Sequence, residues 1–234
     1  MYSSRPIIIL GALDAEVQAF IQALTDGTTH QYGPFQIHEG TLENQRVVIC
    51  QSGVGKVAAS MTTQFLIDRY QPQAVLFTGV AGALNPSYEV GDIVLATDCV
   101  QYDMDARGLG FPVGNIPYTE MRFFKSDSNL LQAAMSSNTG LRIHQGRILT
   151  GDRFVTHEAL PQLMVLNQEL MGDAVEMEGA AVAQVCTIHK IPFLIIRTIS
   201  DKANADSPID FPRFLPVVAK NSFYIVNQMI QIWI

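Results

Sequence analysis

The sequence is poor in cysteine and contains no cluster of metal-ligating residues. Its 234 residues include three cysteines, Cys50, Cys99 and Cys186, which stand far apart in apolar surroundings. No Cys-x-x-Cys pair is present, and no spacing of cysteine and histidine is typical of a zinc site. We therefore predict three reduced cysteines in the core and a protein that uses neither a metal ion nor an organic cofactor.

Basic residues are also scarce, since 15 Lys and Arg stand against 22 Asp and Glu, a formal net charge of −7. An acidic chain without a concentrated basic run binds nucleic acid and anionic membrane surfaces poorly. The first apolar run, residues 7–13, is too short to span a bilayer, and residues 1–5 do not have the layout of a signal peptide. These absences predict a cytoplasmic protein with no nucleic-acid or membrane partner.

Short apolar runs are what the sequence has in quantity, and hydrophobic residues make up 48% of the chain against 16% charged residues. The predicted strands are residues 5–13, 35–41, 46–51, 74–80, 92–101, 143–150, 174–177 and 192–200. The predicted helices are residues 57–70, 128–137, 157–169, 179–190 and 214–233. Strands that alternate with helices are typical of a three-layer α/β sandwich, so we predict one domain over residues 1–234 with a central mixed sheet.

Two segments between these elements are rich in glycine. Residues 101–124 predict an extended loop, of a length that usually carries function or makes an interface. The segment Gly53 to Lys56 is similar to a P-loop, but Cys50 and Val57 stand where that motif needs Gly and Ser or Thr, which excludes an NTPase. We predict instead that this turn permits close approach of the backbone and caps the helix that follows.

Acidic residues follow three of the predicted strands. Glu16 comes after residues 7–13, Glu178 comes after residues 174–177, and Asp201 ends the strand that begins at residue 192. Ligands of open parallel sheets bind outside the carboxyl ends of the strands, so we expect these acids to converge. Converging acids make an acid/base site, and acidic pockets suit the cleavage of bonds whose transition states carry positive charge.

Two further charged positions have alternative interpretations. Arg197 lies inside an apolar strand, where an unpaired charge is costly. It therefore either forms a structural salt bridge or orders the acids of the site. Glu176 and Glu178 alternate along their strand, so at most one of them is expected to face a ligand, and the other to be structural.

Seven segments, taken together, resemble a known family. They are Gly11 to Glu16, Ser52 to Val57, Thr78 to Ala83, Gly91 to Val94, Gly151 to Phe154, Val175 to Ala181 and Arg197 to Asp201. In this order and at these spacings they resemble the 5′-methylthioadenosine/S-adenosylhomocysteine nucleosidases of the purine nucleoside phosphorylase superfamily. The resemblance covers nearly the whole chain and implies a nucleoside phosphorylase-like fold. It also implies hydrolysis of the N-glycosidic bond of an adenine nucleoside that carries a 5′ substituent.

The resemblance implies which residues react. It makes Asp201 the general acid that protonates adenine N7, because adenine is a poor leaving group until it is protonated. It makes Glu16 the base that activates water. Glu178 falls on the position that binds the ribose hydroxyls, where an anionic carboxylate would also favour a positively charged ribose.

The resemblance also implies how the substrate is held. Phe154 stacks on adenine, the backbone of Val155 contacts the base edge, and Met177 packs on the ribose. Leu13, Val54 and Phe211 are implied to surround the 5′ group. The other implied lining positions are Val80 and Arg197. Many members of the family have serine where this chain has Val80, so a hydroxyl near the ribose and the water is missing.

A loop of the chain matches a segment that in the family closes the 5′ pocket of the neighbouring subunit. The matching residues are Ala106, Leu109, Phe111 and Pro117, all within the predicted loop 101–124. This match implies a homodimer and gives a reason for the length of the loop.

Three alternatives stay open at this point. A phosphorylase of the same superfamily would need a phosphate pocket beside the anomeric carbon, and Asp14 and Glu16 would repel that anion. A hydrolase of 6-amino-6-deoxyfutalosine would use the same scaffold, and an apolar 5′ pocket does not exclude it. A nucleoside-binding protein that has lost catalysis would not need Glu178, Arg197 and Asp201 in addition to Glu16.

Overall fold

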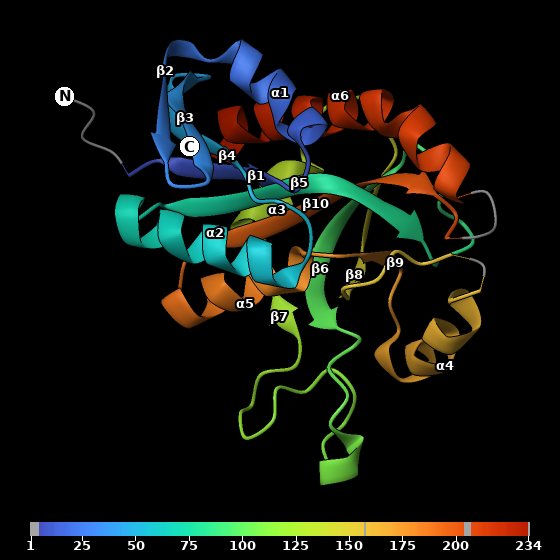
Figure 1. Cartoon of the computed structure of the whole chain (residues 1–234). Coiled ribbons are helices and arrows are strands. Elements are labelled where there is room, and N and C mark those ends of the chain that lie inside the picture. The colour runs from blue at the N-terminus through green and yellow to red at the C-terminus, as the bar shows by residue number, and fades with distance from the viewer. Residues whose placement is uncertain (1–4, 157, 204–206, 234) are drawn as a thin grey trace.

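The computed structural model of the chain describes residues 5–156, 158–203 and 207–233, with the side chains of residues 207–218 outside the description (Figure 1). The strands are β1 Ile7–Gly11, β2 Thr25–Tyr32, β3 Phe35–Leu42, β4 Gln45–Gln51, β5 Ala74–Ala83, β6 Ile93–Gln101, β7 Phe124–Lys125, β8 Ile143–Thr150, β9 Ala174–Glu176 and β10 Phe193–Asp201. The helices are α1 Asp14–Ala23, α2 Lys56–Tyr70, the 3-10 turn Arg107–Leu109, α3 Ser128–Met135, α4 Leu160–Leu170, α5 Gly179–His189 and α6 Ser207–Trp233.

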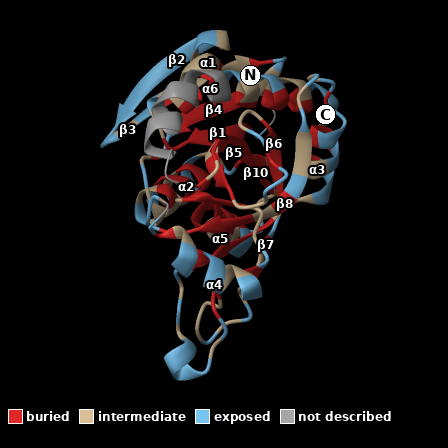
Figure 2. Cartoon of the chain, turned by 90° about the vertical axis from the view of Figure 1, so that its right-hand side faces the viewer, coloured by how far each residue is buried: buried red, intermediate tan, exposed pale blue. Residues whose placement is uncertain are grey.

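Two clusters of buried side chains lie on the two faces of the sheet. In β1, Ile8 and Leu10 belong to the cluster that includes residues of α2 and α5, whereas Ile7 and Ile9 belong to the cluster that includes residues of α1, α3 and α6. Successive side chains of a strand point to opposite faces, and here helices cover both faces, so β1 is apolar throughout. Figure 2 shows this buried centre between exposed outer surfaces. The predicted three-layer α/β arrangement is confirmed, and the three cysteines are buried in the first cluster and free, as predicted.

The position of the site follows from the strand order. The described strands form one ten-stranded mixed sheet in the order β10-β6-β8-β9-β5-β1-β4-β3-β2, with β7 beside β6, and a further pairing of β10 with β5 closes part of it into a ring. On the other edge of β5, β1 pairs as far as Phe77, and β9 pairs from Gly82 onward. The residues of β5 between these two pairings lie where β1 and β9 diverge, and a cavity forms there.

The structure corrects several predicted boundaries. The first strand ends at Gly11 rather than at residue 13, because α1 begins at Asp14 and the Glu16 side chain accepts a hydrogen bond from the amide of Leu13. Neither α1 nor β2 was predicted from the sequence, and β2 is exposed along its whole length and lacks apolar alternation. Helix α6 begins earlier than predicted, at Ser207. No helix within the described ranges is long and apolar enough to cross a membrane.

Candidate active site

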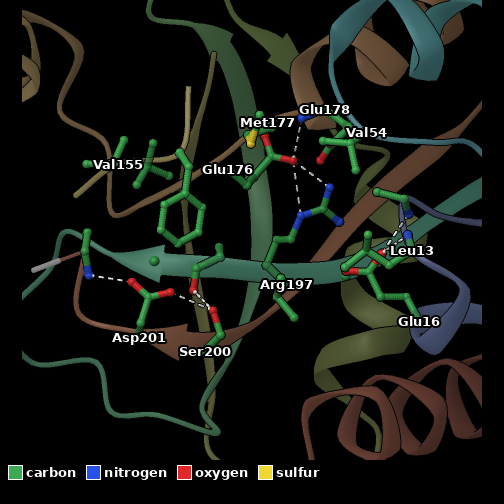
Figure 3. A pocket seen from close by; sticks show the side chains of 18 of the residues that line it. Leu13, Glu16, Val54, Val155, Glu176, Met177, Glu178, Arg197, Ser200 and Asp201 are labelled. Carbon is green, nitrogen blue, oxygen red and sulfur yellow. Dashed lines mark hydrogen bonds and ion pairs between the residues drawn. The ribbon is translucent and has the colours of Figure 1, made fainter. Parts of the chain in front are cut away.

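A cavity of about 260 Å³ lies where β1 and β9 diverge from each other on β5. Ten of the predicted site residues line it: Leu13, Glu16, Val54, Val80, Phe154, Val155, Met177, Glu178, Arg197 and Asp201. The wall is largely apolar, and the acids lie at different places along it. Figure 3 shows Asp201 and Glu16 at opposite ends of the cavity, with Glu178 on a third side.

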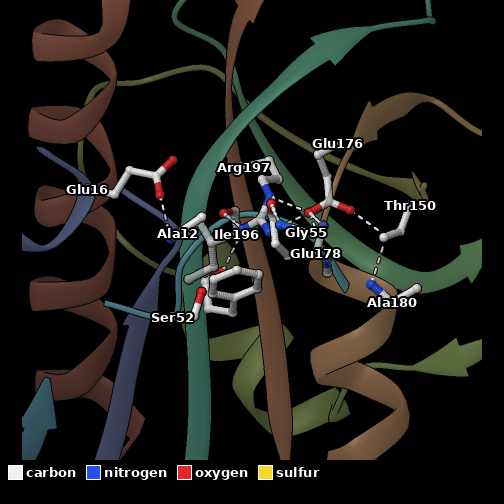
Figure 4. Close-up of polar contacts among 12 residues, drawn as sticks. Ala12, Glu16, Ser52, Gly55, Thr150, Glu176, Glu178, Ala180, Ile196 and Arg197 are labelled. Carbon is white, nitrogen blue, oxygen red and sulfur yellow. Dashed lines mark hydrogen bonds and ion pairs between the residues drawn. The ribbon is translucent and has the colours of Figure 1, made fainter. Parts of the chain in front are cut away.

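Glu16 is held at one end of the cavity by the first turn of α1. Its Oε2 accepts hydrogen bonds from the backbone amides of Ala12 (2.7 Å) and Leu13 (2.9 Å), and only 3% of the residue is exposed (Figure 4). Burial raises the pKa of Glu16, although the amide donors and the charge of Arg197 act in the opposite direction. A raised pKa makes the carboxylate a stronger base, which suits a general base.

Gly79 of β5 leaves room for the Glu16 carboxyl. A Cβ atom on Gly79 would lie 2.9 Å from Oε1 of Glu16 and 3.4 Å from Nη1 of Arg197. A side chain at this position would therefore push the Glu16 carboxyl away from its place in the cavity. The sequence placed this residue within the segment Thr78 to Ala83 of the family resemblance, at the end of an apolar strand, and no role was predicted for it.

Arg197 is buried beneath the cavity and forms an ion pair with Glu176. Its Nη2 lies 2.6 Å from Oε2 of Glu176, and its Nη1 donates to the backbone carbonyl of Phe77 (3.1 Å). Glu176 also accepts hydrogen bonds from the Thr150 hydroxyl and from the backbone amide of Gly179 (2.7 Å). The pair therefore neutralises a buried charge and anchors the start of α5. Among the described residues, no group of His, Cys, Asp or Glu is placed to hold a metal ion.

Glu178 lines the cavity beside this ion pair. Strand β9 ends at Glu176, and Glu178 has left the extended conformation (φ −138°, ψ −32°), so the predicted alternation does not apply and both glutamates line the cavity. Oε1 of Glu178 accepts a hydrogen bond from the amide of Gly55 (2.8 Å). Burial, followed by the charge of Glu176, raises the pKa of Glu178 to about 8. The carboxyl of Glu178 is therefore largely protonated at neutral pH, which differs from the anionic carboxylate expected from the sequence.

Asp201 stands at the other end of the cavity, at a bulge in β10. The pairing of β10 with β5 shifts register between Ile199 and Asp201. The two carboxyl oxygens of Asp201 accept hydrogen bonds from the Ser200 hydroxyl (2.8 Å) and the Ala203 amide (2.7 Å). Phe154, which is 42% exposed, also lines the cavity and offers a ring to a planar ligand.

The turn before α2 joins three segments around the cavity. The Lys56 amide donates to Oδ1 of Asp152 (2.8 Å), and the Lys56 ammonium donates to Oδ1 of Asp103 (2.6 Å). Asp152 in turn donates its amide to Oδ2 of Asp103 (3.0 Å). Lys56 therefore connects the turn, the stem of the loop after β6 and the segment that carries Phe154. Sequence reasoning missed this cluster, although it predicted that the turn permits close backbone contacts.

The loop between β6 and β7 extends away from the body of the protein (Figure 1). The described lining of the cavity does not include Ala106, Leu109, Phe111 or Pro117. Leu109 is 67% exposed, so this loop presents apolar surface to the outside of the chain. Phe211, the remaining predicted site residue, lies in α6, where its side chain is outside the described residues.

Comparisons with known proteins point to one family. The model of the phosphorylase superfamily matches residues 6–231. A 5′-methylthioadenosine/S-adenosylhomocysteine nucleosidase of Colwellia psychrerythraea is 37% identical over 229 residues, which are 95% of this chain and 94% of that protein. The solved structure of such a nucleosidase from Colwellia psychrerythraea, in complex with adenine, has a TM-score of 0.92 and 36% identity and covers 98% of this chain and 96% of its own. The futalosine hydrolase of Helicobacter pylori has a TM-score of 0.92 and 30% identity, with 98% of this chain and 99% of its own covered.

Proposed function

We propose that this chain, which belongs to the 5′-methylthioadenosine/S-adenosylhomocysteine nucleosidase family of the phosphorylase superfamily, is an adenine nucleoside hydrolase. It hydrolyses the N-glycosidic bond of 5′-methylthioadenosine and S-adenosylhomocysteine and releases adenine. The observation that carries the proposal is the placement of Glu16, Glu178 and Asp201 around one largely apolar cavity. Such a cavity excludes water from the charges that develop during the reaction and strengthens their interactions with fixed groups.

Asp201 serves the leaving group in this proposal. Its carboxyl is held in place by Ser200 and Ala203 at the end of the cavity opposite Glu16. Phe154 and Val155, which line the same cavity, stack on the base and contact its edge. A proton passed from Asp201 to adenine N7 gives the base a positive charge, and the electrons of the C1′–N9 bond neutralise that charge as the bond breaks, so adenine leaves as a neutral molecule rather than as an anion.

Glu16 activates the nucleophile at the opposite end. Water adds to C1′ as the C1′–N9 bond breaks, and the proton of that water passes to Glu16. The raised pKa of Glu16 brings its proton affinity toward the neutral range, where a general base works best. The amides of Ala12 and Leu13 fix the carboxyl so that little reorganisation is needed.

The ribose lies between these two ends in this proposal. Glu178 meets its hydroxyls, Met177 and Val80 pack on the sugar, and Leu13, Val54 and Phe211 surround the 5′ group. Arg197 directs its donors to Glu176 and to backbone carbonyls. We therefore assign Arg197 the ordering of the acids rather than a direct hydrogen bond to substrate.

A second subunit completes the 5′ pocket in this proposal. Leu109 and Phe111, with Ala106 and Pro117, lie on the projecting loop and would close the pocket of a partner, so the enzyme works as a homodimer. The exposed apolar surface of the loop supports this assignment, because large apolar side chains at the tip of a loop usually meet a partner. The three free, buried cysteines support a reducing location, which we take to be the cytoplasm.

Two alternatives differ in co-substrate or substrate. A phosphorylase would bring a phosphate anion next to Glu16. The repulsion between the anion and the Glu16 carboxylate favours water over phosphate as the nucleophile. Hydrolysis of 6-amino-6-deoxyfutalosine is favoured by the likeness to the futalosine hydrolase of Helicobacter pylori and needs only a different 5′ group.

The first test is adenine release from 5′-methylthioadenosine in phosphate-free buffer by wild type and Asp201→Asn. Asn keeps the shape of the side chain but cannot donate a carboxyl proton, so we expect wild-type release, no measurable release by the variant, and binding of the nucleoside by both in calorimetry. Asp68→Asn, a change at an exposed acid of α2, is the matched control. Near wild-type turnover by Asp201→Asn would refute the role of Asp201, and a preference for 6-amino-6-deoxyfutalosine in the same assay would support the alternative substrate.

A further inference from the structure

A second cavity, of about 480 Å³, lies beside the first and has a different lining. It is formed by α1, the β2–β3 hairpin and the turn before α2, and it combines the polar side chains of Asp14, His38 and Gln51 with the apolar side chains of Phe35 and Met61. A cavity with a few polar groups on an apolar wall can bind and orient an organic ligand. Nothing in the proposed reaction uses this cavity.

The linings of the two cavities adjoin in two segments of the chain. Leu13 lines the first cavity and Asp14 lines the second; likewise, Val54 lines the first and Gly53 the second. Gln51, in the second cavity, donates a 3.2 Å hydrogen bond to the backbone carbonyl that precedes Leu13. A 5′ substituent that extends past Leu13 and Val54 would therefore reach residues that line the second cavity.

The second cavity is lined by side chains that can bind a cationic group and side chains that can bind an anionic group of a ligand. The carboxylate of Asp14 is fixed by a hydrogen bond from Gln18 (2.6 Å), and its charge acts on His38 across the cavity. Nδ1 of His38 shares a hydrogen bond with the Thr29 hydroxyl (2.9 Å). When the hydroxyl is the donor, the ring proton lies on Nε2, which can then donate to a ligand. An ammonium group is attracted to Asp14, and a carboxylate can accept hydrogen bonds from His38 and from side-chain amides.

We infer that the second cavity binds the α-amino acid end of a long 5′ substituent, with its ammonium group at Asp14 and its carboxylate at His38. The inference rests on the proposed function, because it takes the end of the first cavity at Leu13 and Val54 as the 5′ end. In S-adenosylhomocysteine, two methylene groups separate the sulfur from the carbon that carries both charges, whereas 5′-methylthioadenosine ends in a methyl group. The second cavity therefore recognises one substrate and leaves the other untouched.

The test compares three nucleosides with wild type, Asp14→Asn and His38→Asn. Asn at residue 38 keeps a polar group near the Thr29 hydroxyl and removes Nε2. We expect kcat/KM for S-adenosylhomocysteine to fall about tenfold in each variant, the size of a charged hydrogen bond that is partly exposed. We expect kcat/KM for 5′-methylthioadenosine to stay within about twofold of wild type, since that substrate does not reach the second cavity. 5′-Butylthioadenosine has a similar reach without charges and should also be unaffected.

Each outcome separates this inference from the proposed function. If wild type releases no adenine from any of the three nucleosides, the proposed function fails. If all three reactions change equally in the variants, or if none changes, the proposed function stands and the second cavity does not bind the amino acid end. A loss shared by S-adenosylhomocysteine and 5′-butylthioadenosine alone would show that the cavity binds chain length rather than charge, which would also overturn the inference.

Discussion

The acidic side of the first cavity, formed by Glu16, Glu176, Glu178 and Arg197 and called the floor here, differs in burial from the projecting loop after β6. On the floor, Arg197 is 1% exposed, and its charge is met by Glu176 within the same chain. On the loop, Leu109 is 67% exposed and Tyr118 is 83% exposed. The floor is complete within this chain, whereas the loop presents apolar side chains that the rest of the described chain does not cover. In the account proposed here, the chemistry belongs to a single chain, and closure of the 5′ pocket belongs to a second copy.

The largest effect should come from breaking the floor at Glu16. Glu16→Gln keeps the size of the side chain but cannot take a proton from water, so we expect kcat to fall about 10²–10⁴-fold with little change in binding. Steady-state adenine release and calorimetry with 5′-methylthioadenosine measure the two quantities. Asp14→Asn, a neighbouring acid outside the first cavity, should leave this reaction unchanged. Loss of binding with an unchanged kcat for Glu16→Gln would place the base elsewhere.

A change at the loop should act on substrate affinity rather than on chemistry. Phe111→Ser removes an apolar side chain from the loop, and we expect KM for 5′-methylthioadenosine to rise about tenfold while kcat changes little. Sedimentation of the protein over a range of concentrations should show a weaker dimer. Arg107→Gln alters a polar residue of the same loop and serves as the control. A wild-type KM and an unchanged sedimentation pattern for Phe111→Ser would contradict the role of the loop in a partner's pocket.

Lys56 connects the two regions, so its removal should give a smaller effect. Lys56→Met deletes the ammonium that meets Asp103 but keeps the backbone amide that meets Asp152. Because this ion pair is partly exposed, we expect only about a three- to tenfold rise in KM, with kcat near wild type. Lys125→Met, at an exposed lysine of β7, is the control. A fall in kcat at constant KM would show that Lys56 acts on the chemistry and not on the position of the loop stem.

The smallest expected effect is a pH-dependent change in stability at Glu178. The pKa of this carboxyl is raised from 4.5 to about 8 in the folded protein, so its contribution to stability is present below about pH 4.5 and is lost as the pH rises through about 8. Glu178→Gln is neutral at every pH and avoids that loss. Relative to wild type, we expect the Tm of the variant to rise by several degrees between pH 5 and pH 9. A constant difference in Tm across this range would mean that Glu178 has an ordinary pKa.

The sequence predicted the floor better than its surroundings, for physical reasons. Buried strands such as Ile7–Gly11 leave an apolar run in the sequence, and acids directly after such runs are conspicuous. Strand β2 leaves no such pattern, because it is exposed on both sides. The closure of β10 on β5 and the contacts of Lys56 depend on pairings between distant segments, which no local pattern specifies.

In the proposed reaction water is the nucleophile, because the carboxylate of Glu16 in the largely apolar cavity repels a phosphate anion. The most direct measurement is the rate of adenine release from 5′-methylthioadenosine by wild type as phosphate is added from zero, together with the identity of the sugar product. The account predicts full activity without phosphate, no acceleration when phosphate is added, and 5-methylthioribose as the product. Release that requires phosphate and yields 5-methylthioribose 1-phosphate would contradict it.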